Sequence, residues 1–345
     1  MRVLVTGGTG FIGFPLVKHL LEQGAEVVVL VRNPQSQIAK KLEQYGATLL
    51  PGDVTNPESC KNAMQHIEVL IHNAGVYEYG VTADAARKME QVNVQGTKNV
   101  LEAALEAGVQ KCVYVSTTIA YGASQNAPRD ETYRRSAPYG SYYERTKTQA
   151  HRVALEVQQR GLPLTIVCPN AVVGANDHSI FGYMLRFYLL GLLPPLGWSK
   201  NVMLSLVHLE DVVRGIALAA QKAKTGETYF LCGEAHSKAF MLETWYGHKG
   251  GMKSRVFLPP ALLYPLFAAL EPLQRALGLP AIFSRELVGV GSISLFDTCD
   301  KAKRDFGYTH RSAKELWDST VLAERQLLEQ RPKRDLLSML RPLTE

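Results

Sequence analysis

The sequence predicts an α/β protein with a doubly wound, parallel sheet, followed by a smaller domain of mixed structure. Short runs of valine, isoleucine and leucine alternate with helical patterns over residues 1–170. Strands of this composition are buried on both faces, as in parallel sheets. A glycine-rich turn joins the first run to the first helix. After Pro169 the alternation stops, and the chain becomes richer in aromatic residues and proline.

Six strands and three helices are expected in the first domain. The strands lie at 2–6, 26–31, 47–53, 68–75, 111–118 and 164–169, and a later strand at 228–233 returns to the sheet. Helices are expected at 14–24, at 93–109 and from Tyr143 to about Arg160. Leucines recur at helical spacing in the first two helices, and glycines close them. The first domain therefore spans residues 1–170 with a return near 205–233, residues 171–320 form mainly a second domain, and 321–345 form a charged tail.

Composition and charge exclude several classes of protein. The 345 residues carry a net charge of +6 without long basic runs, which argues against a nucleic-acid-binding protein. Five widely spaced cysteines fit neither a zinc site nor a disulfide framework, and nine histidines show no metal-ligand spacing. The N-terminus lacks the apolar segment and cleavage site of a signal peptide. We therefore expect a cytoplasmic protein without a metal site.

A glycine-rich turn, VTGGTGFIG, follows the first strand and opens the first helix. Gly7, Gly10 and Gly13 allow a tight turn, a close approach of backbone amides to a pyrophosphate, and close packing of helix on strand. The dipole of the helix N-terminus also favours phosphate. A glycine pattern alone is a weak signal, but its place between a strand and a helix predicts a Rossmann dinucleotide site.

The end of the second strand indicates which dinucleotide binds. NAD sites usually carry an acidic residue there for the ribose 2′-hydroxyl, whereas this chain has Arg32 and no acid. A guanidinium suits a 2′-phosphate, so NADP(H) is preferred over NAD(H); the alternative is a solvated surface arginine. Asp53, after the third strand, could accept from the adenine amino group or belong to a helix N-cap region.

Seven motifs follow one another along the chain: TGGTGFIG, GDVT, HNAG (72–75), NVQGTKNV (93–100), VSTTIAYG (115–122), Tyr143-x-x-x-Lys147 and LVHLEDVV (206–213). Their order resembles that in extended short-chain dehydrogenases/reductases, the NAD-dependent epimerase/dehydratase group. The resemblance covers residues 1–235 and, more loosely, 296–308. The pattern is similar to the dihydroflavonol reductase and 3β-hydroxysteroid dehydrogenase branch, and to hopanoid-associated members described as sugar epimerases.

The resemblance implies a catalytic set. Tyr143 matches the family's catalytic phenol and Lys147 its partner, which is also expected to hold the nicotinamide ribose. Residues four apart on a helix share a face, and an ammonium beside a phenol favours the phenolate. Thr117 matches the Ser/Thr that hydrogen-bonds the substrate oxygen, with Ser116 as the second choice. These two hydroxyls could instead bond backbone at the end of the strand.

The remaining predicted site residues surround the cofactor and the substrate. The cofactor set is Gly7, Gly10, Phe11, Ile12, Gly13, Arg32, Asp53, Val54, Asn73, Ala74, Gly75, Asn93, Tyr143, Lys147 and Pro169. The substrate set is Tyr77, Tyr79, Asn170, Phe181 and Arg186. Asn93 is expected to bond backbone near the site rather than take part in chemistry. His208 and Asp211 are expected to be structural.

The predicted function is an NADP(H)-dependent oxidoreductase that reduces a ketone, or oxidises a secondary alcohol, on a bulky apolar substrate. Tyr77, Tyr79 and residues 180–198 are expected to form an apolar pocket wall, although 180–198 could equally be the core of the second domain. A small-molecule substrate of this kind is therefore the expected partner.

Two alternative functions remain open at this point. A nucleotide-sugar epimerase or dehydratase with retained NAD(P) needs cations for a diphosphate. The segment KNVMLSLVHLED lacks the arginine often found there, but Arg186 or Arg255 could supply the charge. The second alternative is a non-catalytic NADP-binding regulator, which is disfavoured because Tyr143 and Lys147 are both present.

Two apolar stretches, 180–198 and 258–270, are too interrupted or too short to span a membrane. Each could be a core helix, a wall of the substrate pocket, or a face that lies on a membrane. Peripheral membrane contact is thus compatible with every function above. The family resemblance also favours a homodimer.

Overall fold

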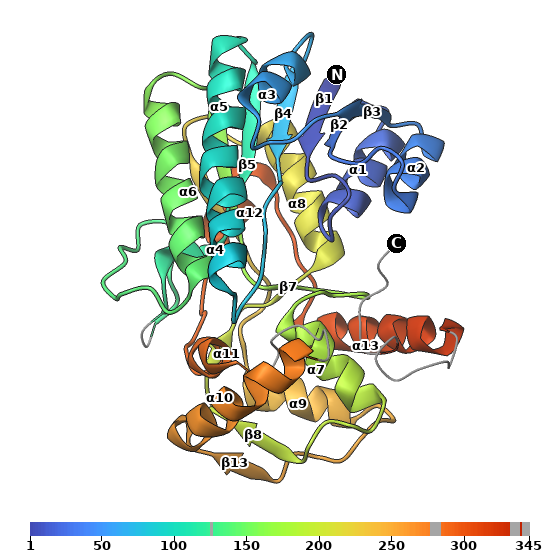
Figure 1. Ribbon diagram of the computed structural model, residues 1–345, viewed down its shortest axis with the longest axis vertical. Coiled ribbons are helices and arrows are strands. Elements are labelled where there is room, and N and C mark those ends of the chain that lie inside the picture. The colour runs from blue at the N-terminus through green and yellow to red at the C-terminus, as the bar shows by residue number, and fades with distance from the viewer. Residues whose placement is uncertain (125–126, 277–283, 332–338, 340–345) are drawn as a thin grey trace.

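A seven-stranded sheet forms the centre of the computed structural model, which describes residues 1–124, 127–276, 284–331 and 339 (Figure 1). All neighbouring strands run parallel, in the order β11-β6-β5-β4-β1-β2-β3. The strands are β1 (Arg2–Thr6), β2 (Glu26–Val31), β3 (Thr48–Pro51), β4 (Val69–His72), β5 (Lys111–Val115), β6 (Leu164–Pro169) and β11 (Thr228–Leu231). The strand order reverses between β1 and β4, which creates a crevice at the carboxyl edge of the sheet.

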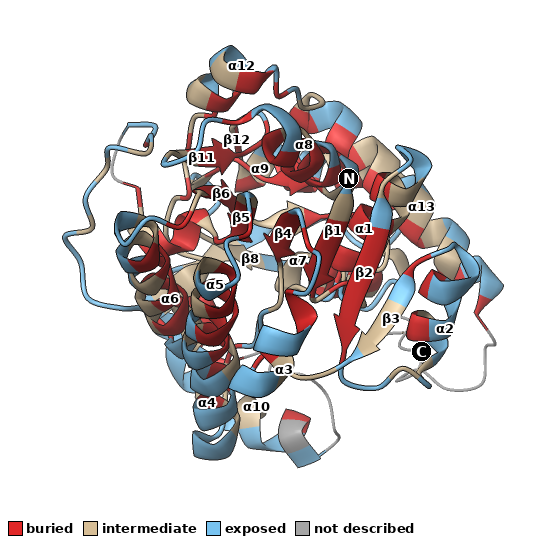
Figure 2. Ribbon diagram, turned by 90° about the horizontal axis from the view of Figure 1, so that it is seen from above, coloured by how far each residue is buried: buried red, intermediate tan, exposed pale blue. Residues whose placement is uncertain are grey.

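Two hydrophobic cores cover the two faces of this sheet. In β1, Val3 and Val5 point into one core and Leu4 into the other, and all three are fully buried. The first face is covered by α1 (Gly13–Glu22), α2 (Gln37–Gln44), α8 (Leu209–Lys222) and α12 (Asp300–Phe306). The second is covered by α3 (Pro57–Ala63), α5 (Thr97–Glu106) and α6 (Tyr142–Gln159), as Figure 2 shows from above. Burial on both faces explains the continuous aliphatic runs of the strands.

The predicted fold class is confirmed, and the strands are shorter than expected. β4 ends at His72 and β5 at Val115, so residues 73–75 and 116–118 lie beyond the strands, at the carboxyl edge of the sheet. The helix expected at 93–109 belongs to a longer helical run that starts ten residues earlier: α4 (Ala83–Glu90) leads into a π-helical segment, η1 (Gln91–Gly96), and then into α5, which ends at Glu106. π-helical segments within longer helices frequently occur at functional sites.

The second domain covers the carboxyl edge of the sheet with helices and two-stranded ribbons (Figure 1). Trp245 and Trp317 form its centre, with ring centroids 5.2 Å apart, and both side chains are buried. Its helices are α7 (Ile180–Leu189), α9 (Lys238–Tyr246), α10 (Pro260–Ala276), α11 (Arg285–Val290) and α13 (Ala313–Gln330). Its ribbons pair β7 (Val172–Val173) with β10 (Val207–His208), β9 (Met203–Leu204) with β12 (His236–Ser237), and β8 (Leu196–Trp198) with β13 (Val256–Leu258).

The charged tail predicted from residue 321 is wrong for residues 321–330, which belong to helix α13. This helix begins with a capping box between Ser312 and Glu315 and runs to Gln330. It buries Val321 and Glu324 against the second domain. The rest of the expected tail, apart from residues 331 and 339, lies outside the described residues.

Asp297 joins the two domains through a buried polar cluster. Its carboxylate accepts hydrogen bonds from Arg129 Nε at 2.7 Å and from Asn170 Nδ2 at 2.6 Å. Its backbone N–H donates to the hydroxyl of Ser205, which in turn donates to the Asp297 carbonyl, each at 3.0 Å. All four residues are buried. The C-terminal segment is thereby bonded to three separate parts of the chain.

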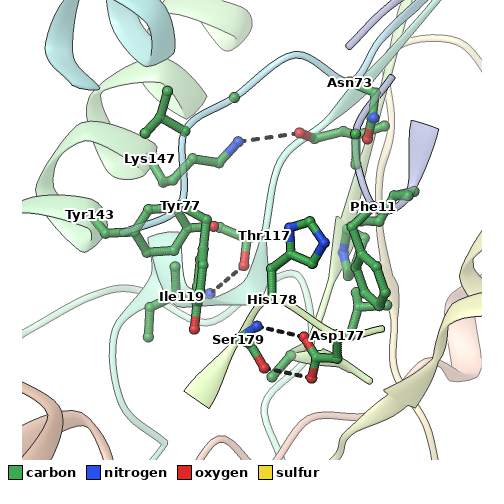
Figure 3. A pocket seen from close by; sticks show the side chains of 18 of the residues that line it. Phe11, Asn73, Tyr77, Thr117, Ile119, Tyr143, Lys147, Asp177, His178 and Ser179 are labelled. Carbon is green, nitrogen blue, oxygen red and sulfur yellow. Dashed lines mark hydrogen bonds between the residues drawn. The ribbon is translucent and has the colours of Figure 1, made fainter. Parts of the chain in front are cut away.

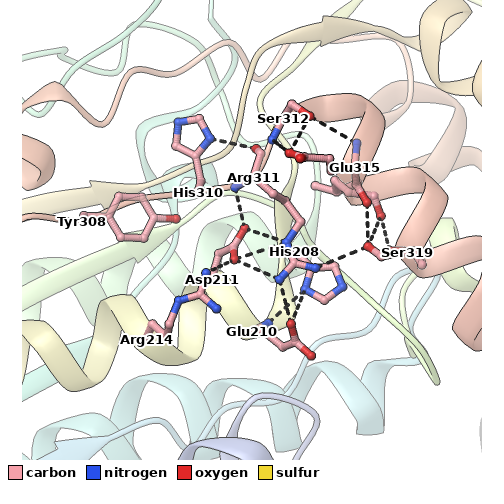
Figure 4. A network of polar contacts seen from close by, with 12 residues as sticks. His208, Glu210, Asp211, Arg214, Tyr308, His310, Arg311, Ser312, Glu315 and Ser319 are labelled. Carbon is pink, nitrogen blue, oxygen red and sulfur yellow. Dashed lines mark hydrogen bonds and ion pairs between the residues drawn. The ribbon is translucent and has the colours of Figure 1, made fainter.

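A second polar network fixes the start of α8 to the segment before α13 (Figure 4). Asp211, which is fully buried, accepts from the backbone N–H of Arg311 at 3.0 Å and from its guanidinium at 3.2 Å. His208 caps α8 by accepting from the N–H of Glu210 at 3.2 Å. Burial and the Arg311 guanidinium lower the pKa of His208 to about 4. His208 and Asp211, which were expected to be structural, therefore both form hydrogen bonds that stabilise the fold.

Candidate active site

A cavity of about 510 Å³ lies at the carboxyl edge of the sheet, between the two domains. Crevices at this position are where open α/β sheets bind their ligands. Its walls come from the glycine-rich turn, the strand ends and α6 on one side, and from α7, α9, α11 and β8 on the other. Most predicted site residues line it: Gly7, Gly10, Phe11, Ile12, Arg32, Asp53, Val54, Asn73, Ala74, Gly75, Tyr77, Tyr79, Ser116, Thr117, Tyr143, Lys147, Pro169, Asn170 and Phe181.

The turn between β1 and α1 is shaped for close contact with an anionic ligand. Gly7 has a φ of 70°, and a Cβ there would lie 2.7 Å from the Cα of Ala74. A Cβ at Gly13 would lie 1.9 Å from the Gly7 carbonyl oxygen, so Gly13 packs against the turn and does not line the cavity. Helix α1 begins without a side-chain cap. The N–H of Phe14 donates to the Gly10 carbonyl and Pro15 has no N–H, so the N–H groups that could meet a phosphate are those before Phe14, up to Gly13. These residues fit the pyrophosphate of a dinucleotide.

Polar side chains follow β2, β3 and β4 at the same edge. Arg32 is exposed at the rim of the cavity, directly after β2. Asp53 accepts from the N–H and the hydroxyl of Thr55 at 2.8 and 2.9 Å, while Asn56 is the residue that caps α3. Asp53 thus stabilises a turn and does not cap the helix. Asn73 donates to the Gly7 carbonyl at 3.4 Å, which joins the loop after β4 to the glycine turn.

Tyr143, Lys147 and Thr117 converge on one part of the cavity (Figure 3). Tyr143 and Lys147 are one turn apart on α6, and Thr117 accepts from the N–H of Ile119 at the start of the short helix η2 (Thr118–Tyr121). The pKa of Tyr143 is raised, chiefly by burial, and the Lys147 ammonium and a hydrogen bond with Thr117 oppose this rise. A phenol, a hydroxyl and an ammonium therefore face the same space.

The sheet holds the Lys147 ammonium in place. Nζ donates to the Val115 carbonyl at 3.3 Å and to the Tyr114 hydroxyl at 3.4 Å. Burial lowers the pKa of Lys147, and the neighbouring Tyr143 raises it. An ammonium has three N–H donors, so these two contacts leave one donor for a ligand in the cavity.

Ser116 is engaged within the protein. Its hydroxyl lies 2.9 Å from Nδ1 of His151, whose Nε2 lies 3.3 Å from the hydroxyl of Tyr121. Burial and the Lys147 charge lower the pKa of His151 to about 4, so this ring is neutral near neutral pH. Because Ser116 already has a buried partner, the geometry favours Thr117 for contact with a ligand.

His72, the last residue of β4, belongs to a continuous hydrogen-bonded chain beneath the cavity. Thr6 Oγ1 lies 2.7 Å from Nδ1 of His72, and Thr97 Oγ1 lies 3.0 Å from Nε2. Thr6 Oγ1 also accepts from the N–H of Ala74, and Thr97 donates to the Asn93 carbonyl. A neutral ring with its proton on Nε2 therefore satisfies every member of the chain.

Acid is expected to destabilise the protein through His72. Burial and the Lys147 charge lower the pKa of His72 to about 3, whereas an unfolded histidine titrates at about 6.5. The neutral, buried His72 ring contributes its full share to the free energy of unfolding above about pH 6.5. As the pH falls from there towards the folded pKa, the free energy of unfolding decreases by about 1.4 kcal/mol per pH unit. His72→Gln should flatten the dependence of the free energy of unfolding on pH by that amount, as measured by urea denaturation. An unchanged slope would contradict this role.

Asn93 does not line the cavity, but it orders the loop beside it. Its Oδ1 accepts from the Val76 N–H at 2.7 Å, and its Nδ2 donates to the Val76 carbonyl at 3.0 Å and to the Thr146 hydroxyl at 3.1 Å. The side chain is buried in η1. Asn93 therefore bonds backbone near the site, as expected, and its placement in the cofactor set is corrected to a positioning role.

The predicted substrate residues differ in how they meet the cavity. The rings of Tyr77 and Tyr79 pack edge-on against Tyr143, with centroids 4.8 and 5.8 Å from it. Phe181 lines the cavity from α7. Asn170 also lines it, but its amide is bonded to Asp297 and to the Leu295 carbonyl, so the side chain is used in joining the domains.

Arg186 does not face the substrate, and the prediction that it lines the pocket is wrong. Its side chain is fully buried on α7 and pairs with Glu324 of α13 at 3.2 Å. It also donates to the carbonyl of Asp177 at 2.8 Å. The carboxylate that neutralises Arg186 lies on a helix far along the chain, and no local pattern around 186 indicates it.

Three adjacent cavity residues were missed by sequence reasoning: Asp177, His178 and Ser179, which precede α7 (Figure 3). The Asp177 carboxylate accepts from the N–H and the hydroxyl of Ser179, both at 2.6 Å, and burial raises its pKa to about 6. The His178 ring lies 5.8 Å from that of Phe11 in the glycine turn. The signal D-x-S before an apolar helix predicts a helix start, but it does not predict that this turn faces the cavity.

Fold and site together define a class: an NAD(P)-binding protein of the extended short-chain dehydrogenase/reductase type, with a Tyr-x-x-x-Lys helix beside a glycine-rich turn. Within this class, the chain belongs to the NAD-dependent epimerase/dehydratase family, which matches residues 3–232. The family predicted by resemblance is thereby confirmed.

Curated relatives and solved structures support the same class. The chain is 33% identical to a 3-beta-hydroxysteroid dehydrogenase of Mycolicibacterium neoaurum over 66% of its length and 63% of the relative's. It is 29% identical to a 4-hydroxy-2-methyl-3-oxo-4-farnesyl-3,4-dihydroquinoline-1-oxide ketoreductase of Stigmatella aurantiaca, over 90% of this chain and 92% of that protein. The crystal structure of gox2253 superposes with a TM-score of 0.77 at 30% identity, covering 94% of this chain and 98% of that one. The names of these curated relatives describe dehydrogenase and reductase activities.

Proposed function

We propose that this protein is an NADP(H)-dependent oxidoreductase that reduces a ketone, or oxidises a secondary alcohol, on a bulky apolar substrate. The observation that carries the proposal is the convergence of Tyr143, Thr117 and Lys147 in the cavity that also contains the glycine-rich turn. When bound there, the nicotinamide cofactor supplies the hydride chemistry. The protein binds it, orients the substrate and moves a proton.

Each of the three side chains has a separate task in the reduction direction. Tyr143 gives its phenolic proton to the substrate oxygen, and Thr117 donates a hydrogen bond to the same oxygen. The Lys147 ammonium stabilises the phenolate that remains and offers its third donor to a ribose hydroxyl. In the oxidation direction the same phenolate accepts the proton. The N–H groups at the start of α1 hold the pyrophosphate.

The substrate side of the cavity supports an apolar ligand. Apolar and aromatic side chains form most of it: Tyr77, Tyr79, Phe181, Met184, Trp198, Leu204, Met241, Leu287, Val290 and Leu295. Lys238 is the cation on this side among the described lining residues, and its ammonium already donates to the carbonyls of Trp198 and Gly291, at 3.3 and 2.5 Å. Burial lowers the pKa of Lys238 to about 8. These features favour an apolar substrate over a nucleoside diphosphate.

The names of the relatives support the same substrate class and suggest probes. They refer to a 3-beta-hydroxysteroid, to a farnesylated dihydroquinoline oxide and, in Shewanella oneidensis, to a 2-alkyl-3-oxoalkanoate. Suitable first probes are a 3β-hydroxysteroid with NADP⁺ and a 2-alkyl-3-oxo acid with NADPH. Turnover of either probe that depends on Tyr143 would support the proposal.

Arg32→Ala is expected to weaken NADPH binding by about 1–3 kcal/mol and to leave NADH binding nearly unchanged, because a charged contact to the 2′-phosphate is lost. Arg32 is exposed at the cavity rim, so the substitution removes no buried contact. Titration by cofactor fluorescence measures both affinities. Arg152→Ala, at an exposed position on α6, is the control.

Equal affinities for NADPH and NADH in the unmodified protein would refute the assignment of Arg32. That result would also favour an epimerase or dehydratase, whose cofactor is reoxidised in place. The unmodified protein would then be tested with a nucleotide sugar and NAD.

A further inference from the structure

Helix α10 is apolar on the side that faces away from the protein as well as on the side that packs. On its packed side, Leu263 and Phe267 are buried, and Trp198 of β8 and Leu258 of β13 pack against them. Leu262, Leu266 and Leu273 are 60%, 47% and 56% exposed. Their spacing of four and seven residues places them on one face of the helix. A helix of a monomeric protein normally carries polar residues on such a face.

The ribbon beneath α10 extends this exposed surface. Val256 of β13 is directly opposite Leu196 of β8, and the two are 50% and 44% exposed. Side chains alternate along a strand, so Leu196 and Val256 lie on the same side of the ribbon as Trp198 and Leu258. Helix α10 packs on Trp198 and Leu258 on that side and leaves Leu196 and Val256 exposed. We call Leu196, Val256, Leu262, Leu266 and Leu273 the apolar face.

Cationic side chains flank the apolar face. Lys253 and Arg255 are exposed immediately before β13. The N–H of Arg255 donates to the carbonyl of Pro195, so this loop runs beside the start of β8. Residues 244–276 contain four lysines and arginines and one acidic residue, Glu271. The end of the apolar face at Val256 therefore lies beside two positive charges, those of Lys253 and Arg255.

The elements that carry the apolar face also form one wall of the cavity. Trp198 of β8 lines the cavity, as do Leu287 and Val290 of α11. Helix α11 packs against α10, and Val288 belongs to the same small core as Leu263. Figure 1 shows α10, β8 and β13 together at the end of the molecule opposite β1. Helix α10, and beneath it the layer formed by β8 and α11, therefore separate the exposed leucines of α10 from the cavity.

We propose that the apolar face lies on an anionic lipid bilayer. Leucines and a valine would enter the interface between headgroups and acyl chains, while Lys253 and Arg255 contact anionic headgroups. The proposed contact is interfacial. Within the described part of the chain, no helix is long and apolar enough to cross a membrane. The wall of the cavity formed by β8 and α11 would then lie on the side of α10 away from the membrane. The contact itself does not depend on the reaction proposed above.

Flotation with lipid vesicles tests this contact without cofactor or substrate, so its outcome is independent of the proposed activity. The full chain should float with vesicles that contain phosphatidylglycerol and bind those of phosphatidylcholine more weakly. L262Q/L266Q should lower the partition coefficient by about tenfold or more, because two apolar side chains no longer enter the interface. K253E/R255E should lower it on anionic vesicles by about fivefold per cation removed.

Leu322→Gln provides the matched control, since Leu322 is 50% exposed but lies on α13, outside the apolar face. It should bind vesicles like the unmodified protein. Thermal melting of each variant confirms that it is folded. Failure of the full chain to bind either vesicle would overturn the proposal, as would binding that L262Q/L266Q leaves unchanged. A dimer in solution that L262Q/L266Q converts to monomer, without vesicle binding, would overturn it in favour of contact with a second copy of the chain.

Discussion

Tyr143→Phe is expected to lower kcat by about 10²–10⁴-fold, the usual contribution of a positioned proton donor. The substitution removes one oxygen and keeps the ring that packs against Tyr77 and Tyr79. The affinity for NADPH should change little, because Lys147 keeps its contacts with Tyr114 and Val115. Initial rates with a 2-alkyl-3-oxo acid or a 3β-hydroxysteroid, and cofactor fluorescence on the same samples, measure the two effects separately.

Tyr142→Phe is the matched control for this experiment. Tyr142 is the neighbouring residue on α6, is 43% exposed and does not line the cavity. It should retain nearly full activity. If Tyr143→Phe retains activity within about threefold of the unmodified protein, a factor well below that of general acid catalysis, Tyr143 is not the proton donor. A non-catalytic, cofactor-binding protein would instead show NADPH binding and no turnover of either probe in the unmodified chain.

Glu324→Gln is expected to lower the free energy of unfolding by about 3–5 kcal/mol, the usual effect of removing one charge from a buried ion pair. The Glu324 carboxylate is fully buried, lies 3.2 Å from Arg186 and 4.0 Å from Arg331, and accepts from the N–H of Asn176 at 2.6 Å. Glutamine keeps the shape of the side chain but removes the negative charge that compensates the buried guanidinium of Arg186.

Urea denaturation measures this loss, with Glu329→Gln as the control on the same helix. Glu329 is exposed near the end of α13, so its substitution should change the free energy of unfolding by less than about 0.5 kcal/mol. Equal effects of the two substitutions would show that the Arg186–Glu324 pair does not stabilise the fold.

The sheet domain was predictable because its signals are local. Each buried strand is a continuous aliphatic run, and the glycine turn and the Tyr143–Lys147 pair have fixed spacings. The placement of Thr117 and Arg32 at the cavity follows from the parallel sheet, which brings the ends of all strands to one edge. The order of the strands along the chain was therefore enough to predict most of the residues on the cofactor side of the site.

The substrate side could not be predicted because contacts between distant segments determine it. From the sequence, Arg186 was predicted to be a ligand-binding cation. In the fold it pairs instead with Glu324 of α13, which no local pattern indicates. Residues 321–330 of α13 were predicted to belong to a charged tail, because the partner that buries Glu324, Arg186 of α7, lies far away in the sequence. Asp177 was missed because a short polar turn carries no sign of which way it faces.

The buried polar cluster around Asp297 determines how small a part of this chain can fold by itself. Residues 3–232 match the family, yet this portion ends before the carboxylate that pairs with Arg129 and Asn170. A fragment cut near residue 232 would contain a complete parallel sheet and a buried guanidinium without its counter-charge. We therefore expect the two domains to unfold in a single cooperative transition and the isolated sheet domain to be unstable. The boundary between the two domains runs along the cavity, but we do not expect it to separate two independently folding bodies.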